Sequence, residues 1–129
     1  MFSSEAVTRG IKVHVEPEYD PSRSQPASGL WFFLYTVTIR NEGSETVQLL
    51  SRHSIITDEQ QQTEEVRGPG VVRETPVLAP NESFQYTSGC PLKTSTGTMH
   101  GSYQMVGDDG TRFDADIAPF ALAMPGALN

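Results

Sequence analysis

The amino-acid sequence predicts an all-β protein, an antiparallel β-sandwich of about seven to nine strands. Three features of the 129 residues lead to this fold class. Apolar and polar residues alternate with a period of two in many short segments, as in strands that bury one face. Glycine, proline, asparagine and aspartate separate these segments, and such residues form turns. No segment carries a sustained apolar stripe with the period of a helix.

The strongest strand signal is the run Trp31–Asn41, which we expect to lie at the centre of the core. Its odd-numbered residues are all apolar or aromatic as far as Ile39, whereas the opposite face begins with Phe32 and Leu34 and then becomes polar. Because side chains alternate between the two faces of a strand, one face of this run is predicted to be buried. The other face enters the interior and then surfaces toward a turn at residues 41–44.

The segment before this run is predicted to contain one strand. Residues 1–10 show no periodicity and are expected to be a loose lead-in, so the ordered core is placed at about residues 10–125. Alternation runs through residues 11–16, and Pro17 is expected to end the strand. Residues 18–29 contain two further prolines, three serines and a glycine, which predict a long loop.

The middle of the chain is predicted to alternate between short strands and polar turns. A period of two resumes at residues 47–49, and a separate short strand is predicted for residues 51–57. The polar run at residues 58–65 is expected to be a solvated hairpin tip. Two prolines flank residues 77–78, so any strand there is predicted to be short and at a sheet edge, where a missing N–H is tolerated.

The last third of the chain predicts a further series of strands. Residues 107–110 are turn formers between two alternating segments, which is the pattern of a β-hairpin. In the segment before this turn, the odd-numbered residues from Met99 onward are predicted to share one face. The expected strands are 84–88, 99–106, 113–117 and 120–124, with a loop at 90–98.

Length and charge indicate a single domain, residues 1–129, that we do not expect to bind nucleic acid or membrane surfaces. A chain of this size buries roughly two-thirds of its unfolded-state surface, whereas a second domain would have too little core. The formal net charge of −7 repels phosphate-rich partners. Cys90 is the only cysteine, no apolar run is long enough to cross a bilayer, and the N-terminal residues do not resemble a signal peptide. These features favour a cytoplasmic protein.

The glycine-containing stretch Arg67–Arg73 is the candidate binding site in the sequence. A dinucleotide fingerprint needs a helix after its glycines, because the helix N-terminus holds the pyrophosphate, and the prolines that follow exclude a long helix. Gly68 and Gly70 would instead let successive backbone N–H groups bind an anion, with Arg67 and Arg73 adding positive charge. The alternative is that the glycines only bend the chain between strands, which is their commoner role.

No other pattern indicates catalysis, a metal site or a cofactor, so we expect no enzyme. The three histidines are far apart and lack the spacing of zinc ligands. No nucleophile elbow is present, and the basic residue nearest to Cys90 is Lys93, as expected for an unreactive thiol.

Two classes of function remain open. The first, which the sequence favours, is a non-enzymatic binding module that recognises a protein partner by its loops or by strand addition, and a homodimer through edge strands is compatible with such a sheet. The second is a protein that binds a phosphate-containing small molecule, pyrophosphate or nucleotide, or weakly hydrolyses it, through the Arg67–Arg73 stretch.

In order along the chain, several segments match the motifs of one known family: Tyr35–Asn41 (YTVTIRN), Leu49–Asp58 (LLSRHSIITD), Glu64–Pro80 (EEVRGPGVVRETPVLAP), Phe84–Gly89 (FQYTSG), Gly97–Tyr103 (GTMHGSY), and Phe113 with Ile117–Phe120 (IAPF). Through them nearly the whole chain resembles the ApaG family. The resemblance implies an immunoglobulin/fibronectin type III-like sandwich and a cytoplasmic bacterial protein associated with cobalt resistance and magnesium efflux. Relatives fused to eukaryotic F-box proteins imply a partner-binding module. The resemblance brings no established biochemical activity.

The chain departs from the family pattern at two positions. The family usually has tryptophan where this chain has Ser54, so we expect a cavity or a repacked patch there, at a cost of about 3 kcal/mol. If a cavity remains, Ser54→Trp raises the melting temperature. In the glycine stretch the family pattern is G-x-G-x-x-G, and Arg73 occupies the place of the third glycine.

Overall fold

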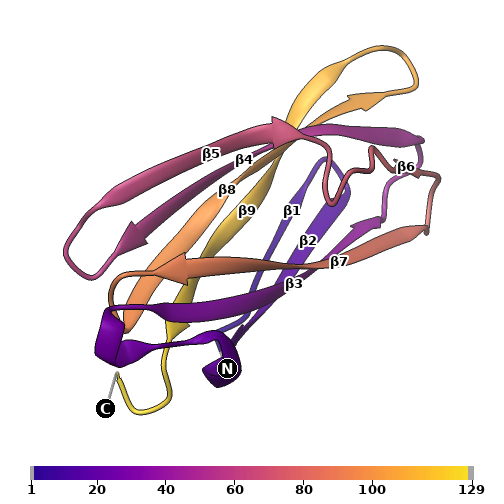
Figure 1. Ribbon diagram of the computed structural model, residues 1–129. Coiled ribbons are helices and arrows are strands. Elements are labelled where there is room, and N and C mark those ends of the chain that lie inside the picture. Colours follow the sequence, from indigo (N-terminus) through magenta and orange to yellow (C-terminus); the bar gives the residue numbers. More distant parts are fainter. Residues whose placement is uncertain (1, 128–129) are drawn as a thin grey trace.

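A computed structural model describes residues 2–127, which form two antiparallel β-sheets packed face to face (Figure 1). The strands are β1 (Ser4–Thr8), β2 (Ile11–Tyr19), β3 (Trp31–Asn41), β4 (Val47–Asp58), β5 (Thr63–Pro69), β6 (Val77–Leu78), β7 (Ser83–Leu92), β8 (Thr96–Gly107) and β9 (Arg112–Ala123). The first sheet has the order β1-β2-β3-β7, and the second has the order β5-β4-β8-β9 with β6 beside β4. The predicted all-β sandwich is confirmed. Within residues 2–127, no helix is long and apolar enough to span a membrane.

The strand β3 occupies the predicted residues and lies inside its sheet, between β2 and β7. Phe33, Val37 and Ile39 are at most 1% exposed, and Trp31 and Tyr35 pack against the same core. The face predicted to be buried is therefore the one that meets the opposite sheet. The short edge strand predicted at residues 77–78 is also present, as β6, which pairs with the start of β4.

The chain begins with a strand where the sequence predicted a loose lead-in, so this prediction was wrong. β1 pairs with β2 over its whole length. Its apolar side chains are few, and Val7 is 57% exposed, so no alternation was visible in the sequence. Pairing with a neighbour and contacts of Glu5 with His14 (3.0 Å) and Lys12 (3.8 Å) hold the strand instead. These contacts with β2 stabilise a strand that the local sequence pattern alone does not predict.

Two prolines lie inside strands, although Pro17 was expected to end a strand and Pro91 was placed in a loop. Pro17 is in β2 beyond Val15, the last residue that β1 pairs with, and Pro91 is in β7, the edge strand of its sheet. A strand side without a neighbour needs no N–H, so proline is tolerated there. The predicted loop at 90–98 is therefore wrong, and only residues 93–95 connect β7 to β8. The long loop before β3 starts later than predicted, at Asp20, and contains two short 3-10 helices, η1 (Pro21–Arg23) and η2 (Pro26–Ser28).

β4 is one strand rather than the two predicted, because it contains a β-bulge. Its pairing with β8 skips a residue between Leu49 and Ser51. One extra residue reverses the alternation of all the side chains that follow. Arg52 therefore pairs with Tyr103, which is 1% exposed, and lies on the inner face. A similar bulge between Ile117 and Phe120 joins the two predicted C-terminal strands into β9.

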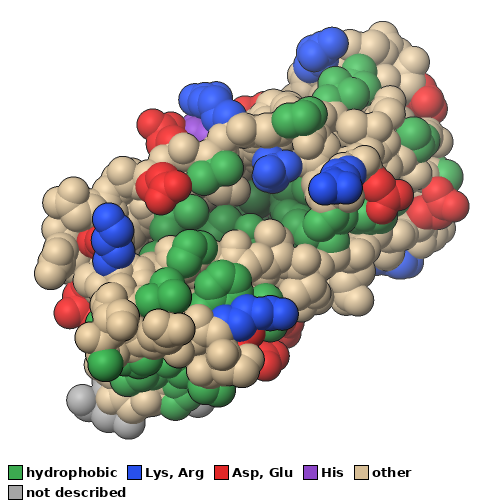
Figure 2. Space-filling model, in the orientation of Figure 1, with side chains coloured by type: hydrophobic (Ala, Val, Ile, Leu, Met, Phe, Trp, Pro, Cys, Tyr) green, Lys and Arg blue, Asp and Glu red, His purple; other side chains and the backbone are tan. Residues whose placement is uncertain are grey.

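The two sheets are closely joined along one side and separate along the other. On the joined side, the Ser4 hydroxyl donates to Ala118 O (2.9 Å) and the Asp116 N–H donates to Thr8 Oγ1 (3.1 Å), which links β1 to β9. On the other side β5 and β7 are the last strands of their sheets, and they lie apart in Figure 1. Figure 2 shows a hollow on this side that is lined by hydrophobic side chains and flanked by Lys and Arg. We call this the open side of the sandwich.

Candidate functional site

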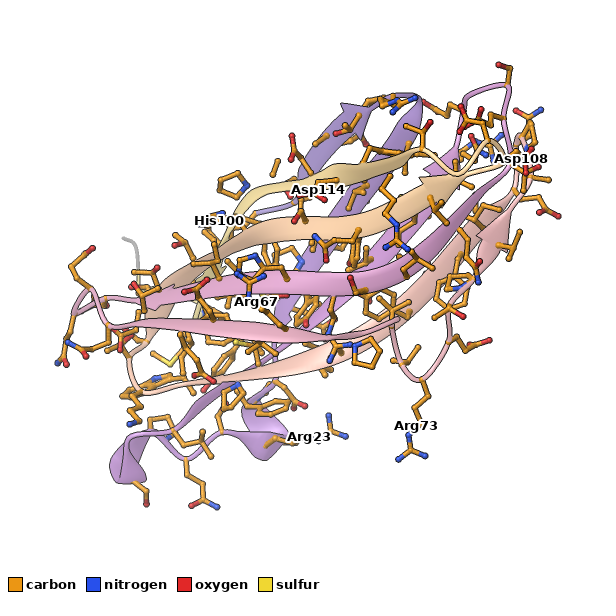
Figure 3. The ribbon with its side chains drawn as sticks, turned by 90° about the horizontal axis from the view of Figure 1, so that it is seen from above. Arg23, Arg67, Arg73, His100, Asp108 and Asp114 are labelled. Atoms are coloured by element: carbon orange, nitrogen blue, oxygen red, sulfur yellow. The ribbon has the colours of Figure 1, made fainter. Side chains whose placement is uncertain are left out.

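The structure does not gather the residues of the predicted anion site. Arg67 lies on the outer face of β5, where its side chain is 73% exposed and its Nη2 is 3.9 Å from Glu65 Oε1. Gly68 pairs with Arg52 of β4, and Gly70 is buried after the strand ends. Figure 3 shows Arg67 over the sheet and Arg73 at the tip of a loop, pointing away from it. The two arginines therefore do not converge on one ligand position.

Backbone N–H groups at the end of this stretch already form hydrogen bonds within the fold. The N–H of Gly70 donates to Leu50 O, and Val71 and Glu74 donate to each other's carbonyls, all at 2.8 Å. An anion nest needs successive N–H groups that are free. The Val71 side chain is 0% exposed and belongs to the core, so the turn inserts an apolar residue between the sheets. This geometry is that of the alternative reading, a glycine-assisted bend.

Arg73, which replaces the third glycine of the family pattern, has a backbone conformation that favours glycine. Val72 and Arg73 are the central residues of the Val71–Glu74 turn, with φ of +42° and +69°. Positive φ at both central residues is typical of the mirror-image turns that favour Asn-Gly. A glycine fits such a position without a Cβ clash, whereas arginine is strained there.

We expect Arg73→Gly to raise the free energy of unfolding by about 0.5–1 kcal/mol, since relief of left-handed strain exceeds the entropy that glycine adds to the unfolded chain. Urea unfolding followed by circular dichroism measures the change. Arg67→Gly is the matched control, because Arg67 is an exposed arginine in a regular strand, and it should lose about 0.5–1 kcal/mol. A loss in both variants would contradict the strain at Arg73.

A different cationic site lies on the open side of the sandwich. Half-buried inward side chains from the four surrounding strands bound it: Tyr35 of β3, Arg52 of β4, Val66 of β5 and Ser88 of β7. We call this space the open-side hollow. The sequence pattern missed Arg52, because the bulge after Leu49 moves it from the outer face to the inner one. The adjacent Leu49-Leu50 pair, which breaks the period of two, was the available signal.

Arg52 is only partly satisfied in the hollow. Its Nη1 donates to Gly70 O (2.9 Å) and Pro69 O (3.3 Å), and no hydrogen bond of Nε or Nη2 is found among residues 2–127. Throughout that range Arg52 forms no ion pair. A guanidinium that is half removed from water without a carboxylate is electrostatically unsatisfied. The site can therefore accept an anionic group.

Three tyrosines lie near enough to Arg52 to be affected by its charge. Tyr86 and Tyr103 share a hydrogen bond between their hydroxyls in the interior, so the two sheets are linked there by a polar contact. Burial raises the pKa of Tyr35, Tyr86 and Tyr103, although the charge of Arg52 opposes the shift in each. All three phenols are therefore neutral at physiological pH. They offer aromatic surface and O–H groups rather than charge.

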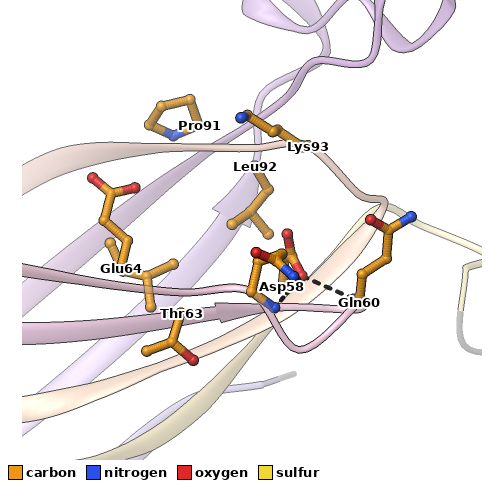
Figure 4. Close-up of a pocket in the computed structure, with 9 residues that line it drawn as sticks. Asp58, Gln60, Thr63, Glu64, Pro91, Leu92 and Lys93 are labelled. Carbon is orange, nitrogen blue, oxygen red and sulfur yellow. Dashed lines mark hydrogen bonds between the residues drawn. The ribbon is translucent and has the colours of Figure 1, made fainter.

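One end of the open side is a pocket of about 410 Å³ between the end of β7 and the β4–β5 hairpin (Figure 4). Pro91, Leu92 and Lys93 line it on one side, and Glu64 lines it on the other. The Asp58 carboxylate accepts from the backbone N–H groups of Gln60 and Gln62 (2.8 and 2.9 Å), which fixes the hairpin turn. This pocket combines apolar surface with charges of both signs.

The remaining reactive residue types do not assemble into a site. His14 lies between Glu16 (2.7 Å) and Glu5 (3.0 Å), and the hydrogen bond to Glu16 is the main cause that raises its pKa. His53 bonds to Glu65 at 2.7 Å. Across residues 2–127, no group of three or more His, Cys, Asp or Glu side chains is placed to hold a metal ion. Burial raises the pKa of the Cys90 thiol to about 12, so it stays protonated.

Comparison with known proteins shows which family this chain resembles over most of its length. The ApaG domain model matches residues 21–107. The chain is 56% identical to "Protein ApaG" of Bradyrhizobium sp. over 120 residues, which are 93% of this chain and 92% of the relative. It is 51% identical to "Protein ApaG" of Bordetella pertussis over 119 residues, covering 92% of this chain and 91% of the relative.

Solved structures show the same sandwich. A crystal structure described as the putative ApaA protein from Bordetella pertussis superimposes with a TM-score of 0.88 at 52% identity, covering 90% of this chain and 94% of that one. A structural-genomics X-ray structure has a TM-score of 0.89 at 47% identity, covering 96% and 94% of the two chains. The C-terminal domain of wzt, at 11% identity and a TM-score of 0.56, shares the fold alone.

Proposed function

Because the chain belongs to the ApaG family, and because its partly unpaired Arg52 side chain lies on the open side, we propose that it is a non-enzymatic protein-interaction module whose binding site is the open-side hollow. The observation that carries the proposal is Arg52, a half-buried cation without an ion pair among residues 2–127, set against tyrosines. We place this activity in the cytoplasm of a bacterium, in line with the lone cysteine and with the bacterial relatives.

The proposed partner is a protein segment that presents a carboxylate next to apolar side chains. A carboxylate on Nε and Nη2 of Arg52 would form charge-assisted hydrogen bonds that compensate the partly desolvated guanidinium. Apolar neighbours would cover the exposed parts of Tyr35 and Val66, which border the same space. Aromatic and arginine side chains in a partly desolvated pocket are the usual anchors of protein interfaces.

The phenotypes that the resemblance implies, cobalt resistance and magnesium efflux, fit this proposal as indirect effects. We propose that the chain contributes to them through a protein partner rather than by holding the ion. Two of the three histidines already bond to carboxylates, His14 to Glu5 and Glu16, and His53 to Glu65. Phosphate binding by the Arg67–Arg73 stretch is the weaker alternative, because Gly70, Val71 and Glu74 use their N–H groups for hydrogen bonds within the fold.

Peptides selected from a random displayed library on the wild-type protein are expected to combine an acidic residue with aromatic or aliphatic neighbours. Their binding should shift the amide signals of Tyr35, Arg52, Val66 and Ser88 in the ¹⁵N-labelled protein. Arg52→Met keeps the aliphatic stem but removes the charge, so it should weaken binding at least about tenfold, as expected for a lost charge-assisted hydrogen bond.

Arg112→Met is the matched control for this test, because Arg112 is exposed and lies outside the hollow. It should bind the selected peptides like the wild type. Melting curves of both variants show whether either has lost its fold. Peptides that bind folded Arg52→Met as tightly as the wild type, or shifts that cluster away from the hollow, would remove the proposal.

A further inference from the structure

The edge of β5 presents regularly spaced backbone groups, and of those that face away from β4 only the Pro69 carbonyl has a partner within residues 2–127, Arg52 Nη1 at 3.3 Å. Hydrogen bonds in an antiparallel ladder alternate along each strand, so one bonded pair sets the phase for the rest. At the hairpin, the Asp58 N–H donates to Gln62 O (3.0 Å), and beyond the other end Gly70 N–H donates to Leu50 O (2.8 Å). Both bonds give the same phase, in which the even-numbered residues of β5 bond to β4.

The odd-numbered residues of β5 therefore direct their backbone groups away from the sheet. These residues are Thr63, Glu65, Arg67 and Pro69. Pro69, which has no N–H to leave unpaired, falls in this outward phase, as expected at an edge. An exposed edge with free N–H and C=O groups is a template for pairing with another strand.

We propose that β5 pairs with β5 of a second copy of this chain, antiparallel, about a two-fold axis at Val66. Two such edges pair through their outward residues, and the possible registers differ in which charges meet. Alignment of Glu65 with Glu65, or of Arg67 with Arg67, places like charges opposite each other and is unfavourable. Alignment about Val66 places Glu65 opposite Arg67 of the second copy, and Arg67 opposite Glu65.

This register satisfies the backbone as well as the charges. Glu65 and Arg67 both lie in the outward phase, so each exchanges two backbone hydrogen bonds with its opposite residue across the axis. Thr63 faces Pro69 of the second copy: the Thr63 N–H donates to the Pro69 carbonyl, and because proline has no N–H, the Thr63 carbonyl at the end of the ladder stays exposed to water. An interface that uses one patch of both copies reciprocally is the isologous type that closes as a dimer.

The other strand edges are less suited to this role. The edge of β9 already receives side chains of β1, since Asp116 N–H donates to Thr8 Oγ1 and Ala118 O accepts from Ser4. No residue of β7 (SFQYTSGCPL) is charged, so its edge offers no pair of opposite charges that would select a register. Pairing through β5 uses backbone groups in the plane of the sheet and leaves the even-numbered side chains, such as Val66, directed into the open-side hollow. Dimerisation and partner binding are thus separate properties.

Analytical ultracentrifugation of the full chain, from micromolar to millimolar concentration, tests the dimer. The wild type should show a concentration-dependent dimer. Glu65→Lys and Arg67→Glu should each weaken the dimer at least about tenfold, since both place like charges opposite each other twice. The double variant E65K/R67E should dimerise like the wild type. An equimolar mixture of the two single variants should form a heterodimer, because the altered charges complement each other only between chains.

Each outcome bears on the proposal. A wild type that stays monomeric, or single variants that dimerise normally, would overturn it. Failure of the mixture to associate would overturn the register about Val66 even if a dimer exists. Arg52→Met is the control that separates this inference from the proposed function, since it should dimerise normally. Circular dichroism of each variant excludes loss of the fold, and rescue by mixing cannot arise from a change within one chain.

Discussion

Gly70→Ala is expected to lower the free energy of unfolding by about 3 kcal/mol, one of the largest effects of a single methyl group in this chain. Gly70 has φ of +57°, and a Cβ there would lie 2.1 Å from the backbone oxygen of Glu74. Left-handed strain contributes about 1–2 kcal/mol. The clash opens the turn and draws Val71 out of the core, which costs part of the roughly 1.5–3 kcal/mol that burial of such a side chain provides. Urea unfolding measures the loss.

Gly68→Ala is the matched control for this prediction. The three atoms nearest to a Cβ at Gly68 all belong to the Arg52 guanidinium, at 3.1–3.2 Å, and this flexible side chain can move away. We expect its stability to stay within about 1 kcal/mol of the wild type, as for a surface change without a backbone clash. Equal and small losses at both glycines would mean that the turn does not lock Val71 in place.

Ser54→Trp is expected to destabilise the protein by about 2 kcal/mol, although tryptophan is the usual family residue at this position. Ser54 is 6% exposed and borders a cavity of only about 10 Å³. Such a cavity holds no more than about one water molecule. Of the two outcomes expected from the sequence, a cavity or a repacked patch, the structure has the repacked patch. An indole there would displace Tyr86, Tyr103 or Phe120, which line the same cavity.

Ser54→Ala provides the control, because it changes the polarity of the site but adds no volume. Its stability should remain within about 1 kcal/mol of the wild type. Thermal melts followed by circular dichroism compare the three proteins. A rise in melting temperature for Ser54→Trp alone would show that the surrounding side chains leave room for the ring.

The fold was predictable from the sequence because each sheet has one buried face, which imposes a period of two. The run from Trp31 made this clear, since its buried face is apolar throughout. Features that depend on a neighbouring strand were not predictable. β1 has too little apolar character to show a period, and Pro17 and Pro91 are tolerated only because one side of each strand is unpaired.

The candidate site was predicted less well than the fold. The glycines at 68 and 70 suggested an anion site, whereas the N–H groups of Gly70, Val71 and Glu74 form hydrogen bonds within the fold. The geometry instead singles out Arg52, to which the sequence analysis gave no role. The reason is the skipped residue in the β4–β8 ladder, which changes no amino acid but reverses which side chains face inward.

That skipped residue has a consequence for comparing relatives of this chain. If a homologue lacked the extra residue, Leu50, β4 would pair with β8 without a bulge and Arg52 would still lie opposite Tyr103 on the inner face. If a homologue instead kept every residue but closed the bulge, each later side chain of β4 would exchange sides. His53 and Ile55 would then enter the space between the sheets, and Arg52 would turn to solvent. Two chains could thus agree at every position of the strand and still present opposite chemistry to a ligand, because the pairing of β4 with β8 at this point decides which side chains face inward.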